Sequence, residues 1–216
     1  MVKMYQSGPL HKDRFKIAIK LEFLLKSGDL LFRASDAHGP LGIPFSRLVS
    51  YVTKCPYSHV AIGIRNKYNE VEILEINDEG TTIYRPIDWL DSCYTNKLKI
   101  MRLNSNLMTD EVKIQLNNEI DRLSSEDEDY DFTFSSPSKL YCTESAVELY
   151  RRCNILISPP RYLKEIVNLP IYCIIRFGGW FLSLFGKTVE LPVDIPLWTP
   201  IDLLQSKHFY CIYENT

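Results

Sequence analysis

The 216-residue sequence predicts one α+β domain, spanning residues 1–216, in which an antiparallel sheet packs against helices. Three observations favour this class. Short apolar runs separated by turn residues follow one another, as the strands of an antiparallel sheet do. The longest segments with apolar residues at helical spacing come before the first of these runs or after 97–103, so the overall order is helix, sheet, helix, helix. A content of 45% hydrophobic residues is sufficient for one sizeable core.

The first elements lead from a helix into the sheet. Residues 14–26 carry apolar side chains at helical spacing, and Ser27-Gly28-Asp29 ends this pattern. A short buried strand is expected at 30–32. Residues 43–53 again have the spacing of a helix.

The clearest element is a β-hairpin. Residues 59–64 are rich in β-branched side chains, and residues 71–76 form a second run of the same kind. The segment between them, 66–69, has the composition of a turn. The two runs are therefore expected to pair as antiparallel strands.

Two further strands are expected at 81–84 and 97–103, with a short helix or turn at 87–93 between them. Thr109 is the predicted N-cap of a helix that runs through Leu123, because carboxylates follow it in the first turn. The aromatic run at the C-terminus reads as a last strand.

A cysteine lies where the next helix is expected to begin. Cys142 precedes the helical run 145–152. Unpaired backbone N–H groups and the positive end of the helix dipole stabilise a thiolate there and lower its pKa below the free value of about 8.5. Cys142 is therefore a candidate nucleophile, although a structural cysteine could occupy the same position.

His59 is the candidate base, because it starts a strand and an imidazole can take up a thiol proton near neutral pH. The residue opposite His59 in the hairpin falls between Glu75 and Asn77, which share a face. Glu75 is the first candidate to orient the imidazole, and Asn77 is the second. The alternative from these residues alone is a core histidine beside a solvated glutamate.

Charge and cysteine spacing restrict the function classes. A net charge of -2 and a pI near 6.1 give no general reason to expect nucleic acid as a partner. The six cysteines are widely spaced and contain no Cys-x-x-Cys pair, which favours free thiols. Residues 1–20 have charges throughout and resemble no signal peptide, so a cytoplasmic location is expected.

Neither a metal nor another cofactor is expected. The alternating aspartates of 127–131 lack the glycine and glutamate that a calcium loop needs. Gly186-Lys187-Thr188 follows an apolar run instead of a flexible phosphate-binding loop. Cys55 and His59 could share a metal, but no second ligand pair has a zinc-like spacing.

Residues 166–186 are almost wholly apolar and approach the length of a membrane span, which is about 20 residues. Pro170, Arg176 and a double glycine interrupt the segment. Three interpretations stay open: a transmembrane helix, an interfacial or pocket-covering hairpin, and a buried helical pair. The hairpin is favoured, and it would allow peripheral contact with a membrane.

Several sequence pieces, in order, resemble a known family. They are Ser27-Gly28-Asp29-Leu30-Leu31-Phe32, Tyr57-Ser58-His59-Val60-Ala61-Ile62, Leu74-Glu75-Ile76, Tyr130-Asp131-Phe132-Thr133-Phe134, Leu140-Tyr141-Cys142-Thr143-Glu144 and, more weakly, Trp198-Thr199-Pro200-Ile201-Asp202-Leu203. Over roughly residues 27–205 the chain resembles the YiiX-like branch of the circularly permuted NlpC-type papain-like superfamily. The histidine precedes the cysteine helix, an order shared by lecithin:retinol acyltransferase-like and poxviral relatives.

The resemblance implies a permuted papain-like fold, with an antiparallel sheet or barrel packed against the helix that bears the nucleophile. It implies Cys142 as nucleophile, His59 as general base and Glu75 as orienting residue. The expected function is a cysteine hydrolase, of thiol protease or amidase type, or an acyltransferase that cleaves an amide or ester through an acyl-enzyme. The alternative is a catalytically idle module of this fold that binds a lipid or a protein.

Two further expectations concern the substrate. The backbone N–H of Cys142 would stabilise the oxyanion, with a hydroxyl from Tyr130 or Tyr57 nearby, although both tyrosines could serve packing alone. Residues 159–196 depart from the resemblance as an apolar helical insertion that could cap a pocket, act as a structural flap or bind a partner. Its side chains expected to face a small-molecule, lipid or acylated-peptide substrate are Ile174, Phe177, Trp180 and Phe181.

Overall fold

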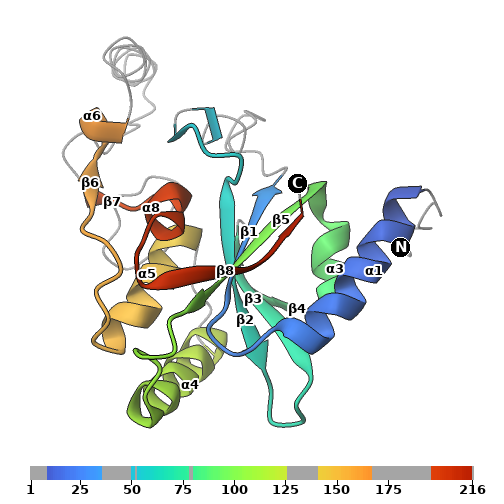
Figure 1. Cartoon of the computed structure of the whole chain (residues 1–216), viewed down its shortest axis with the longest axis horizontal. Coiled ribbons are helices and arrows are strands. Elements are labelled where there is room, and N and C mark those ends of the chain that lie inside the picture. Colours follow the sequence, from blue (N-terminus) through green and yellow to red (C-terminus); the bar gives the residue numbers. More distant parts are fainter. Residues whose placement is uncertain are drawn as a thin grey trace.

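The computed structural model describes residues 9–35, 50–51, 53–77, 80–125, 141–166 and 196–215. Its centre is an antiparallel sheet with the strand order β4-β3-β2-β1-β5-β8 (Figure 1). These strands are β1 (Leu30–Ser35), β2 (His59–Arg65), β3 (Val71–Asn77), β4 (Gly80–Tyr84), β5 (Cys93–Leu103) and β8 (Phe209–Asn215). Two short strands, β6 (Arg161–Tyr162) and β7 (Pro196–Leu197), pair separately.

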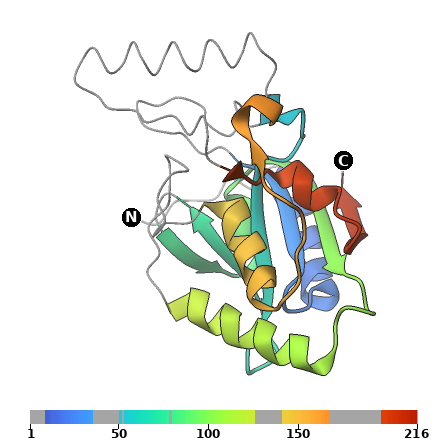
Figure 2. The ribbon, with the colours of Figure 1, turned by 90° about the vertical axis from the view of Figure 1, so that its left-hand side faces the viewer.

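Helices cover both faces of the sheet (Figures 1 and 2). One face packs against α1 (Pro9–Leu24) and α3 (Pro86–Asp91), and the other against α4 (Asp110–Ser125) and α5 (Cys142–Arg152). Because side chains alternate along a strand, Leu31 lies in the core between the sheet and the helices α1 and α3, whereas Leu30 and Phe32 lie in the core between the sheet and the helices α4 and α5. The sheet is therefore buried on both sides. Two short helices, α6 (Leu163–Ile166) and α8 (Pro200–Leu204), lie in the C-terminal part.

The α+β prediction is confirmed, and the expected hairpin is present as β2 and β3. The first helix starts earlier than expected, at Pro9, and the strand expected at 30–32 extends to Ser35. Thr109 lies at the start of α4, where its Oγ1 accepts a hydrogen bond from the Val112 backbone N–H at 3.3 Å. This is the expected N-cap contact.

The sheet does not close into a barrel, which was one form of the predicted fold. Within the described residues β4 and β8 are its two edges, and they do not pair with each other. Most of the helix expected at 43–53 and of the insertion expected at 159–196 lies outside the described residues. In the part of the chain that the structure describes, no helix is both long and apolar enough to cross a membrane.

A turn at Gly28 fixes how α1 and β1 sit against the far helices. Gly28 has a φ of 87°, a left-handed conformation that glycine adopts without strain. A Cβ at this position would lie 2.5 Å from Leu116 Cδ2 of α4. The Tyr150 hydroxyl of α5 donates to the Gly28 carbonyl oxygen. This turn is therefore packed directly against both α4 and α5.

The substitution Gly28→Ala is expected to lower the free energy of unfolding by about 1–3 kcal/mol, because it adds backbone strain and a clash with Leu116. Thermal or urea unfolding measures the loss. Asn154→Gly is the control, because Asn154 also has a left-handed φ, of 59°, and glycine there relieves strain instead of creating it. Equal stability of Gly28→Ala and the wild type would contradict the packing argument.

Candidate active site

Cys142 is the first residue of α5, as the sequence predicts. The preceding residue, Tyr141, has an extended backbone, and its carbonyl oxygen accepts the Ser145 backbone N–H at 3.0 Å. The backbone N–H groups of the first helical turn have no acceptor within the helix, and they form the positive end of the helix dipole. Cys142 is only 5% exposed, so this part of the helix is held inside the protein.

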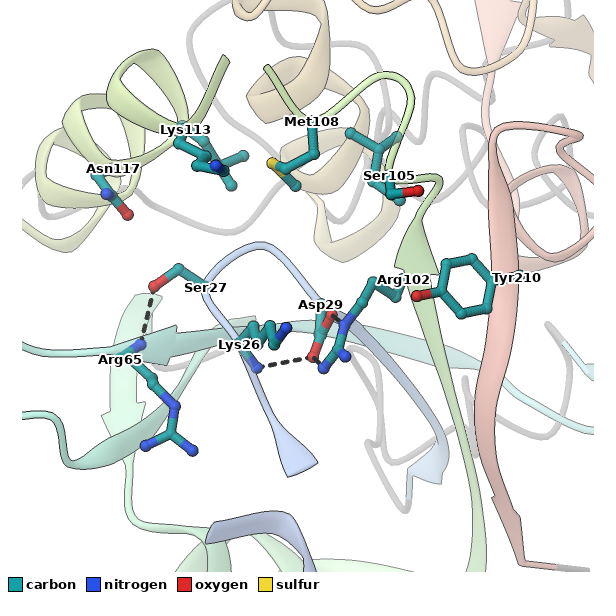
Figure 3. Close-up of a pocket in the computed structure, with 12 residues that line it drawn as sticks. Lys26, Ser27, Asp29, Arg65, Arg102, Ser105, Met108, Lys113, Asn117 and Tyr210 are labelled. Atoms are coloured by element: carbon teal, nitrogen blue, oxygen red, sulfur yellow. Dashed lines mark hydrogen bonds and ion pairs between the residues drawn. The ribbon is translucent and has the colours of Figure 1, made fainter. Parts of the chain in front are cut away.

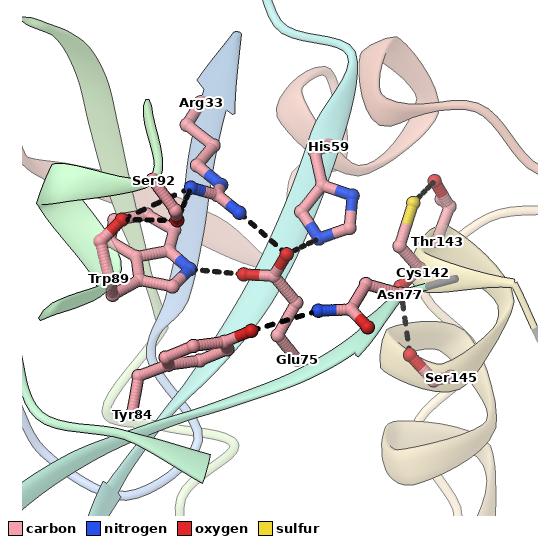
Figure 4. Close-up of polar contacts among 10 residues, drawn as sticks. All are labelled: Arg33, His59, Glu75, Asn77, Tyr84, Trp89, Ser92, Cys142, Thr143 and Ser145. Carbon is pink, nitrogen blue, oxygen red and sulfur yellow. Dashed lines mark hydrogen bonds and ion pairs between the residues drawn. The ribbon is translucent and has the colours of Figure 1, made fainter. Parts of the chain in front are cut away.

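His59 is the first residue of β2 and is also only 5% exposed. Its ring lies between Glu75 and Cys142 (Figure 4). The Nε2 atom is 3.0 Å from Glu75 Oε1, and both groups are almost completely buried. The ring therefore has a carboxylate at one nitrogen, while its other nitrogen faces the side from which α5 approaches.

The charges in this cluster support one another. Burial alone would lower the pKa of His59, but the Glu75 carboxylate and the Cys142 thiolate raise it to about 10. Burial alone would raise the pKa of Cys142, but the His59 imidazolium and hydrogen bonds from His59 and the Val60 backbone lower it. Both shifts favour a thiolate beside an imidazolium.

The carboxylate of Glu75 has a second cationic partner that the sequence analysis missed. Arg33 Nη2 donates to Glu75 Oε1 at 2.6 Å, and Trp89 Nε1 donates to Oε2. Arg33 Nη1 also donates to the Trp89 carbonyl oxygen at 3.1 Å and to Ser92 Oγ at 2.7 Å. The guanidinium lies over the Trp89 ring, 4.7 Å from its centroid. The orienting carboxylate is therefore held from both sides.

A signal for Arg33 existed in the sequence. Arg33 directly follows the apolar residues 30–32 of a strand expected to be buried, and a buried charge needs a partner. The pairing of β1 with β2 places Arg33 opposite His59. Trp89 had no comparable signal, because its approach to Glu75 depends on how α3 folds onto the sheet.

Of the two residues considered as orienting groups, the structure brings Glu75 to the ring of His59. Asn77 instead donates from Nδ2 to the Tyr84 hydroxyl at 3.1 Å. The Tyr57 hydroxyl donates its proton to Glu214 Oε1 of β8 at 3.3 Å, so in this arrangement it does not donate to a group at Cys142. Burial, followed by the Glu214 carboxylate, raises the pKa of Tyr57.

The other predicted site residues lie outside the described residues. They are Tyr130, Ile174, Phe177, Trp180 and Phe181. Close to Cys142, the structure adds Thr143, whose Oγ1 is 3.9 Å from the sulfur. It also brings the residue after β7 to the residue before α5, because the Trp198 backbone N–H donates to the Tyr141 hydroxyl at 2.8 Å.

A solved structure resembles this fold closely. It is the crystal structure described as metalloprotein yiiX from Escherichia coli O157:H7, which matches with a TM-score of 0.69 and 18% sequence identity, covering 88% of this chain and 97% of that one. In the described part of this chain, no three side chains of the histidine, cysteine, aspartate or glutamate type gather so that they could hold a metal ion. The described residues therefore do not supply a binding site for a metal ion.

Comparison with curated proteins gives no match. A family model does match, over residues 25–213, and its description is a permuted papain-like amidase enzyme of the YaeF/YiiX, C92 family. The matched region includes β2, β3 and α5, and thus all three residues of the cluster. The order of these elements, histidine strand before cysteine helix, is the permuted one. The chain belongs to the YaeF/YiiX family of permuted papain-like amidases, a cysteine hydrolase family.

Proposed function

We propose that this chain cleaves an amide bond with Cys142 as nucleophile, His59 as general acid and base, and Glu75 as the residue that orients His59. The observation that carries the proposal is the buried contact of 3.0 Å between His59 Nε2 and Glu75 Oε1, beside a cysteine whose pKa is lowered. A histidine held in this way keeps one nitrogen for the thiol.

The reaction has two halves. The Cys142 thiolate attacks the carbonyl carbon, and a bond forms between sulfur and carbon. His59 gives its proton to the leaving amine as the carbon–nitrogen bond breaks, which leaves an acyl-enzyme and a neutral imidazole. A water molecule then loses a proton to His59 and attacks the thioester, which releases the acid and restores the ion pair.

Stabilisation of the oxyanion is assigned to backbone donors. The N–H of Cys142 lies in the first turn of α5, where no helical carbonyl accepts it. The positive end of the helix dipole points in the same direction. The Tyr57 hydroxyl would have to leave Glu214 to contribute. The role of Tyr130 stays a prediction.

The proposal also covers the type of bond, the acyl acceptor and the class of substrate. An ester could replace the amide, and an acyl acceptor could replace water, because the same acyl-enzyme serves both reactions. A lipid or acylated peptide is proposed from the apolar sequence 166–186 alone. Co-sedimentation with liposomes tests membrane contact: the intact chain should sediment more than a chain without residues 166–186, and equal sedimentation would remove the idea.

A thiol-directed acyl-type probe tests the proposed nucleophile. Labelling followed by peptide mapping should find Cys142 modified first, ahead of the other cysteines. Cys153, on the same helix, is the internal control, because burial and then Glu119 raise its pKa to about 11. Labelling of Cys142 should be lost in His59→Ala. Equal labelling of all cysteines, or no dependence on His59, would favour an idle binding module.

The pH dependence of two rates should separate the two groups. Alkylation of Cys142 requires only the thiolate, so its rate should rise with pH through a midpoint below the usual cysteine value and then stay constant. Turnover also needs the proton on His59, so it should fall again as pH passes about 10. A turnover rate that stays constant above this pH would contradict the role of His59 as proton donor.

A further inference from the structure

A cavity with a volume of about 530 Å³ lies in a part of the fold that does not include the Cys142 cluster (Figure 3). The loop between α1 and β1, the ends of β2 and β5, the start of α4, and β8 contribute to it. Arg65 lines this cavity at the end of β2, whereas His59 begins the same strand. The strand length places the two about 20 Å apart. The cavity is therefore separate from Cys142.

The floor of the cavity is a buried ion pair. Arg102 Nε and Nη2 donate to Asp29 Oδ1 and Oδ2, both at 2.7 Å. The Lys26 backbone N–H adds a third hydrogen bond to Asp29 at 2.8 Å. The Asp29 side chain is 2% exposed, and that of Arg102 is 16% exposed. Asp29, the one carboxylate among the described residues of the lining, is thus paired with Arg102.

The remaining charges around the cavity are positive. Four lysine and arginine side chains and one aspartate line it, a net charge of +3 in a chain whose overall charge is -2. Arg65 donates to the carbonyl oxygens of Glu22 at 2.7 Å and Leu25 at 2.9 Å, which fix the guanidinium without cancelling its charge. Lys113 pairs with Asp110, but both side chains are largely exposed, so this pair is weak.

Neutral groups complete the lining. Ser27, Asn117 and Tyr210 bring hydroxyl and amide groups that can donate hydrogen bonds to an anion. Leu103, Met108 and Leu116 add an apolar wall. Cavities of roughly 300–1,000 Å³ with mainly apolar walls and a few polar groups are typical of sites for small molecules. The lining fits a ligand with an anionic head and a short apolar body.

We propose that this cavity binds a small, soluble organic phosphate monoester. A phosphate monoester carries close to two negative charges at neutral pH, and Lys26 and Arg65 provide two positive charges. The charge of Lys26 acts on Asp29, but that carboxylate is already paired with Arg102 at 2.7 Å. Lys113, on α4, faces the cavity from the opposite side (Figure 3). The apolar wall accounts for an organic group in place of free phosphate.

Titration calorimetry of the full chain with phenyl phosphate tests the site. The double variant Lys26→Gln/Lys113→Gln should weaken binding about tenfold or more, because two charge-assisted contacts are lost. Lys26→Arg/Lys113→Arg should retain most of the affinity. Lys16→Gln is the matched control, because Lys16 is an exposed lysine of α1 that does not line the cavity. Inorganic phosphate should bind more weakly than phenyl phosphate.

Three results of the calorimetric titrations would overturn the proposal, and one result with vesicles would do the same. One is the absence of binding, and another is equal affinity of the wild type and the double glutamine variant. The third is inorganic phosphate that binds as tightly as phenyl phosphate, which would leave an adventitious ion only. Vesicles that contain phosphatidic acid form a last arm, and preferential binding to them would assign the cavity to a lipid headgroup instead of a soluble ester.

Discussion

Replacement of Cys142 by alanine is expected to lower turnover of an activated ester such as 4-nitrophenyl acetate by about 10³-fold or more. The physical reason is that no other group in the cluster can form the acyl-enzyme. His59→Ala should have an effect of similar size, because without the imidazolium the thiol loses the partner that lowers its pKa. Steady-state kinetics at neutral pH measure both losses.

The matched control is Cys153→Ala. Cys153 is the C-cap residue of the same helix and is 2% exposed, so the substitution removes a buried thiol without touching the ion pair. It should change stability but leave the activity per folded molecule unaltered. The double variant Cys142→Ala/His59→Ala should be no less active than Cys142→Ala, because the two residues act as one unit. Turnover that persists in Cys142→Ala would place the nucleophile elsewhere.

The part of the site that could be predicted depends on local sequence. The helix start at Cys142 follows from residues next to it, and the pairing of His59 with the 75–77 region follows from one short hairpin turn. The strand pairing alone, however, does not identify the residue that contacts His59. The register that pairs Ile62 with Leu74 continues to place Asn77 opposite His59, yet Glu75 makes the contact with the ring. Strand periodicity gave the face, and side-chain length decided which residue reaches the imidazole.

The rest of the site depends on contacts between distant segments. Arg33 reaches Glu75 because β1 lies beside β2, and Trp89 reaches it because α3 packs on the same face of the sheet. Neither approach can be obtained from local spacing. Whether the sheet closes also depends on contacts between distant segments, because a barrel would require β4 to pair with β8. The family resemblance alone did not decide between an open sheet and a barrel.

Arg33 completes a buried cluster of balanced charge. With the thiolate and the imidazolium formed, Arg33 and His59 carry two positive charges, and Glu75 and Cys142 carry two negative ones. Loss of Arg33 would leave one excess negative charge in a region that excludes water. In a medium of low dielectric constant such an excess is costly, and the cluster can relieve it by protonating Cys142. Arg33 thus supports the thiolate without contacting it.

The substitution Arg33→Met is therefore expected to lower the free energy of unfolding by about 3–5 kcal/mol at neutral pH, because it leaves Glu75 without its fixed counter-ion. A double-mutant cycle with Glu75→Gln measures the coupling, and the double variant should lose less than the sum of the two single losses. Lys99→Met is the comparison, because the partly exposed pair of Lys99 with Glu214 should be worth about 1 kcal/mol or less.

Two pH measurements distinguish this role from a loss of packing. Burial alone would raise the pKa of Glu75, but His59 and Arg33 lower it to about 2, so its contribution to stability is present above the usual value of 4.5 and is lost as pH falls toward 2. The destabilisation by Arg33→Met should accordingly be full above pH 4.5 and decrease below it. The alkylation midpoint of Cys142 should also move to higher pH in Arg33→Met and much less in Arg33→Lys, which keeps the charge. A pH-independent loss of stability with an unchanged midpoint would reduce Arg33 to a packing residue.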